Sequence, residues 1–249
     1  MSVFHFKRFS VVNERSAMKV NTDGVLLGAA MTILPTDRRL LDVGTGTGTI
    51  ALMAAQRVQG EIPYQVRDEV MIDAIDIDEP SATEAAANFS NSPWQAMLHA
   101  HNMSLDRFAA DVERAEVKYD LIFSNPPYFE DSMPAPDERK STARHTSEGL
   151  SYRDIFEFAK DRLTEEGRVS LVLPSDQEAA VCRYARMCSL HLFRILRIRT
   201  IARKAPSRVI LEFSRLRKAT PEDTVMTIQN EGQYTQEYLS LTKDFYLFA

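Results

Sequence analysis

The fold is decided by the stretch Asp42-Val43-Gly44-Thr45-Gly46-Thr47-Gly48, which holds three of the nine glycines in this 249-residue chain. It follows the short apolar segment 39–43, which we expect to be a strand, and a helical pattern begins at Thr49. Glycine lets the backbone turn sharply between the two and lets a ligand approach it closely. The Gly-x-Gly-x-Gly spacing differs from the Gly-x-Gly-x-x-Gly of dinucleotide-binding proteins, and the Gly-Lys-Ser/Thr of a P-loop does not occur.

Apolar segments alternate with helical patterns on the carboxyl side of this turn. The expected strands are 39–43, 70–77, 95–100, 119–123, 168–173, 190–201 and 208–216, and the expected helices are 49–58, 81–89, 152–163 and 176–187. This alternation predicts an α/β fold with a doubly wound, mostly parallel seven-stranded sheet and helices on both faces. The last two strands are joined by the short turn 203–207, so we expect them to form an antiparallel pair.

The length and composition favour one domain spanning residues 1–249. Apolar residues make up 44% and charged residues 26% of the chain, which excludes disordered and fibrous classes. We expect residues 1–36 to form an N-terminal extension with a strand over 4–9 and a helix over 25–34, capped by Thr22 or Asp23. Residues 220–249 form a C-terminal extension to which the sequence assigns no role.

Several classes of protein are disfavoured by what the sequence contains. The two cysteines, Cys182 and Cys188, are too few for a disulfide framework or a Cys-rich zinc site, so we expect no metal. We find no apolar run of the roughly 18 residues that a membrane span needs, and no apolar signal segment at the start. We therefore expect a cytoplasmic protein without a membrane partner, and a monomer.

Polar side chains follow the expected strands at their carboxyl ends, where ligands bind in doubly wound sheets. Asp76 ends the second strand and could accept hydrogen bonds from both hydroxyls of a ribose, whereas Asp78 fits a helix N-cap better. Asn102 follows the third strand, and its amide could bind the edge of an adenine.

The motif Asn125-Pro126-Pro127-Tyr128 follows the fourth strand and resembles the Asn/Asp-Pro-Pro-Tyr/Phe signature of methyltransferases that act on planar amino groups. The amine of adenine is a poor nucleophile because its lone pair is delocalised into the ring. Two acceptors, the Asn125 side-chain oxygen and the Pro126 carbonyl, could draw its N–H groups towards tetrahedral geometry. Proline fixes φ and holds that carbonyl rigidly, and Tyr128 offers a ring for stacking. A simple turn, which Asn-Pro-Pro also encodes, is the alternative.

Charge is distributed unevenly along the chain. Residues 183–218 hold eleven Lys and Arg and one acidic residue, a balance of +10, so with the net charge of −5 the remaining residues sum to −15. A basic segment on an acidic protein favours a polyanionic partner, since Arg and Lys contact phosphates. The candidate RNA contacts are Arg194, Arg197, Arg199, Arg203, Lys204 and Arg208, with Arg139 and Arg144 in the polar loop 131–148.

These motifs together resemble a known family. With Asp42 before it, the glycine turn is similar to motif I of class I S-adenosylmethionine-dependent methyltransferases. Phe4-x-Phe6-Lys7-x-Phe9 followed by Ala17-Met18-Lys19-Val20-x-Thr22-Asp23-Gly24-Val25-Leu26-Leu27-Gly28 looks like the opening of the bacterial tRNA (adenine-N6)-methyltransferases, which modify adenine 37 of a valine tRNA.

The resemblance implies a class I fold, S-adenosylmethionine as cofactor, S-adenosylhomocysteine as product and tRNA as partner. The catalytic residues would be Asn125, Pro126, Pro127 and Tyr128. The cofactor would be bound by Thr22, Asp23, Asp42, Gly44, Thr45, Gly46, Gly48, Asp76, Ile77, Asn102, Met103 and Asn125. A base beside the anticodon lies in a loop, so little energy is needed to splay it into a pocket.

Three other functions remain open at this point. A glutamine-N5 methyltransferase acting on release factors uses the same Asn-Pro-Pro-Tyr chemistry, but those enzymes carry a helical domain before motif I. A DNA adenine methyltransferase would need a target-recognition domain that this length hardly allows. A non-catalytic RNA-binding module is disfavoured because the glycine turn and the Asn125–Tyr128 motif are both intact.

Overall fold

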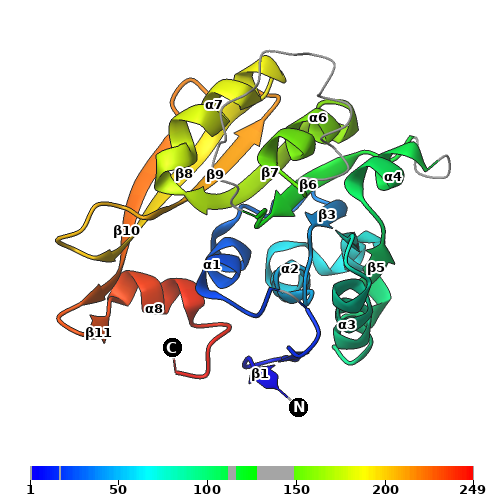
Figure 1. Ribbon diagram of the computed structural model, residues 1–249, viewed down its shortest axis with the longest axis horizontal. Helices are drawn as coiled ribbons and strands as arrows, with labels where there is room; N and C mark the ends of the chain where they lie inside the picture. Colours follow the sequence, from blue (N-terminus) through cyan, green and yellow to red (C-terminus); the bar gives the residue numbers. More distant parts are fainter. Residues whose placement is uncertain (1, 17, 112–115, 128–148, 249) are drawn as a thin grey trace.

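The computed structural model describes residues 2–16, 18–111, 116–127 and 149–248. Within them the chain forms a nine-stranded sheet in the order β11-β10-β8-β9-β7-β6-β3-β4-β5 (Figure 1). The strands are β3 (Arg39–Val43), β4 (Met71–Asp76), β5 (Leu98–Asn102), β6 (Tyr119–Ser124), β7 (Leu163–Pro174), β8 (His191–Ile201), β9 (Arg208–Ser214), β10 (Glu222–Asn230) and β11 (Gln233–Tyr234). Neighbours run parallel, except that β9 opposes β7 and β8, and β11 opposes β10.

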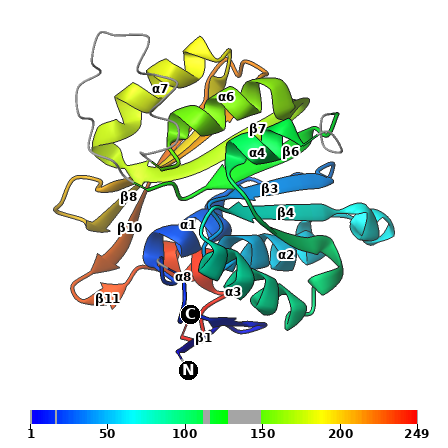
Figure 2. The ribbon, with the colours of Figure 1, turned by 45° about the vertical axis from the view of Figure 1, so that its right-hand side comes forward.

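Helices cover both faces of the sheet. They are α1 (Thr22–Ala30), α2 (Thr49–Glu61), α3 (Glu79–Ser90), α4 (Leu105–Ala110), α6 (Tyr152–Arg162), α7 (Glu178–Met187) and α8 (Gln236–Thr242), with 3₁₀ turns η1 (Tyr64–Glu69), η2 (Gln95–Met97) and η5 (Ser175–Gln177). In Figures 1 and 2, helices α1, α2, α3 and α8 lie on one face of the sheet and α4, α6 and α7 on the other. One apolar cluster packs between the sheet and the first group, and a second packs under the second group. None of the helices in the described ranges is long and apolar enough to span a bilayer.

The predicted fold class is confirmed. The seven expected strands all lie in the main sheet, and β8 and β9 form the expected antiparallel pair through register pairs such as Ile195 with Leu211. The prediction was wrong about the number of strands, because the C-terminal extension adds two more. In that extension β10 runs parallel to β8, and its Met226 and the following helix α8 pack into the first apolar cluster.

The N-terminal extension also differs from the prediction. Of residues 4–9, only Phe4 and His5 lie in a strand, β1 (Val3–His5), and residues 6–9 turn the chain into β2 (Ser10–Val12), which pairs with β1 as an antiparallel hairpin. The phenylalanines Phe6 and Phe9 are buried at the turn, stacked with ring centroids 4.5 Å apart. Alternation alone cannot distinguish a single strand from a tight turn that buries two aromatic rings.

The cap of α1 is a further correction. Neither Thr22 nor Asp23 caps this helix, because Asn21 precedes it and its side-chain oxygen accepts from the Gly24 N–H at 2.8 Å. The helix ends at Ala30, well before Pro35. Asn21 therefore fixes the start of α1 beside the glycine turn, where the carboxyl ends of β3 and β6 meet.

Candidate functional site

The glycine turn between β3 and α2 has the conformation that its sequence requires. Gly44, Gly46 and Gly48 have φ angles of +72°, +56° and +79°, in the left-handed region that other residues rarely adopt. A Cβ on Gly48 would lie 2.5 Å from the ring of Phe89 on α3, so this position needs glycine for its packing as well. The turn thus carries the backbone closely past α3 into the first residues of α2.

The side chain of Asp42 stabilises the glycine turn. It is fully buried, and the Thr45 hydroxyl donates to its Oδ2 at 2.7 Å. Burial, which outweighs the opposing Thr45 hydrogen bond, and the nearby charge of Asp76 together raise the pKa of Asp42 to about 7. Because Asp42 is fully buried and bonded to Thr45, it holds the loop from within the protein.

Asp76 at the end of β4 faces the glycine turn. Its carboxylate accepts from the Gly46 N–H at 2.8 Å and from the Asp78 N–H at 2.9 Å, and burial raises its pKa. Asp78 is the N-cap of α3, with its carboxylate accepting from the Ser81 N–H at 3.0 Å. The structure therefore gives the two aspartates the separate positions that the sequence favoured.

The loops after β4 and β5 lie against each other. The Asn102 side-chain nitrogen donates to the carbonyls of Asp76 and Ile77, both at 3.1 Å, so its oxygen is the group that can face a ligand. The Met103 N–H donates to the same Asp76 carbonyl at 3.0 Å. Ile77 is 75% exposed, which leaves a large apolar side chain on the surface next to the Asp76 carboxylate.

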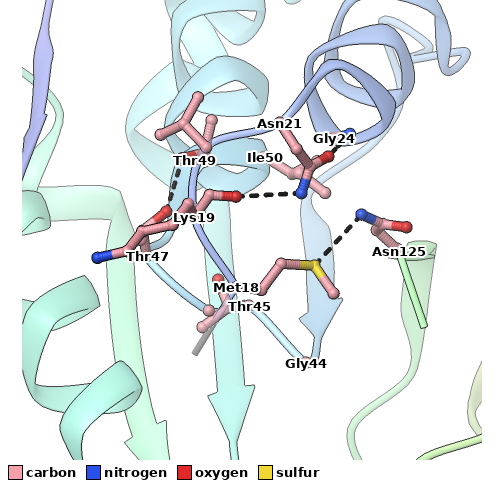
Figure 3. A pocket seen from close by; sticks show the side chains of 12 residues that line it. Met18, Lys19, Asn21, Gly24, Gly44, Thr45, Thr47, Thr49, Ile50 and Asn125 are labelled. Atoms are coloured by element: carbon pink, nitrogen blue, oxygen red, sulfur yellow. Dashed lines mark hydrogen bonds between the residues drawn. The ribbon is translucent and has the colours of Figure 1, made fainter. Parts of the chain in front are cut away.

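Asn125 and Pro126 are buried where β6 ends, and Pro127 is exposed. The Ser124 hydroxyl donates to the Val43 carbonyl at 2.6 Å, which ties this strand end to the glycine turn. An open pocket lies between them (Figure 3). It is lined by Met18, Lys19, Val20, Asn21, Gly24, Gly44, Thr45, Gly46, Thr47, Thr49, Ile50 and Asn125.

Two helices begin at this pocket. Asn21 and Gly24 belong to the N-terminal end of α1, and Thr49 and Ile50 to that of α2. The cap of α2 is Gly48, which has no side chain to satisfy the first N–H groups of that helix. Unsatisfied N–H groups and the helix dipole both favour a negatively charged group at such an end. The pocket is therefore suited to a ligand that carries a carboxylate or phosphate.

The pocket wall includes a segment near the N-terminus that was not among the predicted site residues. We call residues 13–16 and 18–21 the N-terminal strap. Glu84 of α3 is buried, and its carboxylate accepts from the Glu14, Arg15 and Ser16 N–H groups at 2.8, 2.9 and 3.1 Å. Four residues further along α3, Asn88 bonds to both Val12 backbone groups and to the Thr47 carbonyl. Glu84 and Asn88, four positions apart on an otherwise Ala-rich helix, are the sequence feature that could have indicated a polar contact on this face of α3.

Several predicted site residues are not among those that line the pocket, namely Thr22, Asp23, Asp42, Gly48, Asp76, Ile77, Asn102, Met103, Pro126 and Pro127. Thr22 is exposed on α1, and the Asp23 carboxylate forms an ion pair with Arg208 at 2.7 Å; neither lines the pocket. Tyr128, Arg139 and Arg144 lie outside the described residues.

The predicted RNA contacts fall into two groups. Arg194 pairs with Glu212 at 2.7 Å and Glu222 at 3.1 Å, and Arg197 pairs with Glu178 at 2.6 Å and Asp223 at 2.5 Å. With the Arg208 pair, these contacts offset part of the charge that the sequence count found. Arg199 donates to the Thr227 hydroxyl and the Ala202 carbonyl, and Arg203 and Lys204 are exposed on the turn between β8 and β9.

The chain is similar to known methyltransferases. Residues 16–184 match the methyltransferase small domain family. The tRNA1(Val) (adenine(37)-N6)-methyltransferase of Parabacteroides distasonis is 40% identical over 247 residues, covering 98% of this chain and 97% of the relative. The enzyme of the same name from Flavobacterium psychrophilum is 38% identical over 245 residues, covering 98% and 99%.

Solved structures share the fold at low sequence identity. A predicted O-methyltransferase from Agrobacterium tumefaciens aligns with a TM-score of 0.63 at 15% identity, covering 90% of this chain and 96% of that one. A protein from Listeria monocytogenes assigned as a class I S-adenosylmethionine-dependent methyltransferase aligns with a TM-score of 0.51 at 15% identity, covering 93% and 70%. The expected class I fold is thus confirmed, and the chain belongs to the methyltransferase small domain family.

Proposed function

We propose that this protein transfers a methyl group from S-adenosylmethionine to the exocyclic N6 of adenine 37 in a valine tRNA. The observation that carries the proposal is that Asn125, at the end of β6, lines the same pocket as Gly44, Thr45 and Gly46. A methyl donor bound at the glycine turn would then lie next to an amine that is hydrogen-bonded to Asn125. The names of the full-length relatives give the substrate.

The residues around the pocket fit S-adenosylmethionine. The Asp76 carboxylate, already hydrogen-bonded to the Gly46 N–H, can accept from ribose hydroxyls, and the exposed Ile77 beside it can pack on the adenine ring of the cofactor. The N-terminal ends of α1 and α2 favour binding of the carboxylate on the methionine part of S-adenosylmethionine. When bound, the cofactor supplies an electrophilic methyl group on a sulfonium.

Asn125 and Pro126 would prepare the amine of the target base. Asn125 is only 7% exposed, so a hydrogen bond to its oxygen would form away from bulk water. Its Oδ1 and the Pro126 carbonyl accept the two N6–H groups and direct the nitrogen lone pair towards the methyl carbon. After methyl transfer N6 would release one proton to solvent, so Asn125 and Pro126 need only hold and orient the amine. Alignment and acceptors placed in advance provide the catalysis, without a general base.

The tRNA would approach along the edge of the sheet that carries Asn125. Strands β6, β7 and β8 end at this edge, so Arg199, Arg203 and Lys204 lie on the same side as the pocket. We place the RNA contact on these three residues in preference to Arg194, Arg197 and Arg208, whose carboxylate partners offset their charge. Such contacts position the phosphates without reading the sequence.

The proposal also includes the organisation of the chain. The pairing of β10 with β8 supports a single methyltransferase domain that incorporates both extensions. We propose that this domain acts as a monomer in the cytoplasm, and light scattering of the purified protein tests its oligomeric state.

The experiment that tests this function uses labelled S-adenosylmethionine with total tRNA and, separately, with release factor. Digestion of the tRNA should yield labelled N6-methyladenosine, and mapping should place it at position 37 of a valine tRNA. Labelled N5-methylglutamine in the release factor, with unlabelled tRNA, would instead identify the enzyme as a glutamine methyltransferase.

A further inference from the structure

The side chain of Met18, in the N-terminal strap, reaches across the pocket to Asn125. Its sulfur lies 3.6 Å from the Asn125 side-chain nitrogen, within the range of an N–H···S hydrogen bond. Figure 3 shows that the Asn125 amide turns its nitrogen towards this sulfur and its oxygen away from it. The two ends of the catalytic amide are therefore in different surroundings.

A thioether can distinguish these two ends. The methionine sulfur accepts weakly and cannot donate, so it attracts an amide N–H and offers nothing to an amide oxygen. An asparagine amide can otherwise rotate by half a turn and exchange its donor and acceptor with little change in shape. Only one of the two orientations turns Oδ1, and not the N–H group, away from the sulfur and towards the place where the amine of a substrate would donate.

We propose that Met18 is a positioning residue, which holds the Asn125 amide in the orientation that presents Oδ1 to the target amine. This inference rests on the proposed function, since it assigns a role within the same site. Met18 acts through Asn125 and need not touch the reacting atoms itself.

The main chain of the strap is held firmly enough for this task. The Ser16 hydroxyl donates to the Met18 carbonyl at 3.1 Å and accepts from the Ser81 hydroxyl of α3 at 3.0 Å. A Cβ placed on Gly46 would lie 3.7 Å from the Met18 carbonyl, so the strap crosses directly over the glycine turn. The three backbone bonds to Glu84 fix the same segment just before Met18.

The substitution Met18→Leu tests the proposal because leucine keeps the apolar volume and removes the acceptor. We expect kcat for tRNA methylation to fall about three- to tenfold, the cost of one weak hydrogen bond that selects the reactive orientation. The Kd for S-adenosylmethionine should stay within about twofold of the wild type, because the orientation of Asn125 acts on the amine. Met187→Leu, at an exposed position on α7, is the matched control and should leave both values unchanged.

A double-mutant cycle separates positioning from general packing. Asn125→Asp keeps acceptor oxygens but has no N–H for the sulfur to bind, so adding Met18→Leu to it should change kcat by less than about twofold. An unchanged kcat in Met18→Leu, or an equal loss in both backgrounds, would overturn the proposal. A loss confined to cofactor binding would overturn it too.

Failure of this inference can be told apart from failure of the proposed function. If the wild-type enzyme forms N6-methyladenosine and Met18→Leu forms it at the same rate, only the role of Met18 is wrong. If the wild-type enzyme methylates no adenine, the proposed function itself is wrong.

Discussion

Replacing Gly48 by alanine should strongly destabilise the protein at the glycine turn. Gly48 has a φ of +79°, which costs a residue with a Cβ about 1–2 kcal/mol. The new Cβ would also lie 2.5 and 2.9 Å from two ring carbons of Phe89, which is itself only 2% exposed and cannot move aside freely. Forcing an extra methyl group into a packed core costs about 1–3 kcal/mol more. The expected loss in the free energy of unfolding is therefore about 2–5 kcal/mol.

Gly60 provides a matched control in the same helix. A Cβ at Gly60 would meet nothing within 4 Å, and its φ is not in the left-handed region. Gly60→Ala should raise the free energy of unfolding by about 0.5–1 kcal/mol, because alanine is the better helix former. Urea unfolding followed by circular dichroism measures both variants, and they should move in opposite directions from the wild type. A Gly48→Ala variant within about 0.5 kcal/mol of the wild type would refute this account of the turn.

Three more predictions concern the strap, a buried carboxyl group and the RNA contact. Glu84→Gln replaces one acceptor oxygen with an N–H donor that faces the backbone N–H groups of the strap. The strap should then be held less firmly, and trypsin should cut it about tenfold faster or more. An unchanged cleavage rate would show that Glu84 does not hold the strap. Because burial raises the pKa of Asp42 to about 7, the native state favours the neutral carboxyl group. The raised pKa therefore contributes stability at low pH, and this contribution is lost as the pH rises from about 4 through 7. Urea titrations should therefore show the wild type losing up to about 4 kcal/mol more than Asp42→Asn over this range, whereas parallel curves would contradict the shift. Replacing Arg203 and Lys204 together by alanine should raise KM for tRNA several-fold and leave kcat unchanged. The slope of log KM against log salt concentration should fall by about one to two, and an unaltered slope would mean that these residues do not contact the phosphates.

The sheet and the glycine turn could be predicted from the sequence because their signals are local. The segment 39–43 was predicted as a strand and is β3 with the same bounds, and α2 begins at Thr49 as expected. Apolar runs, a glycine cluster and a helical period all lie within a few neighbouring residues. The position of Asn125 followed from the same reasoning, since parallel strands bring their carboxyl ends to one edge of the sheet.

The contacts that complete the site could not be predicted in the same way, because they join residues far apart in the chain. Glu84 binds the backbone of Glu14, 70 positions earlier, and Arg208 pairs with Asp23 across 185 positions. A net charge counted along a segment does not show which arginines will meet a carboxylate after folding. Similarly, the hydrophobic pattern of residues 220–249 does not indicate which edge of the sheet β10 pairs with.

The central claim is that Asn125 supplies a catalytic acceptor to an aromatic amine. Its most direct test is the single-turnover rate of Asn125→Ala on a valine tRNA, with the label traced to adenine 37. We expect this rate to fall about 100-fold or more, the usual cost of losing one preorganised hydrogen bond in a transition state, while S-adenosylmethionine still binds. A variant that methylates adenine at close to the wild-type rate would contradict the account.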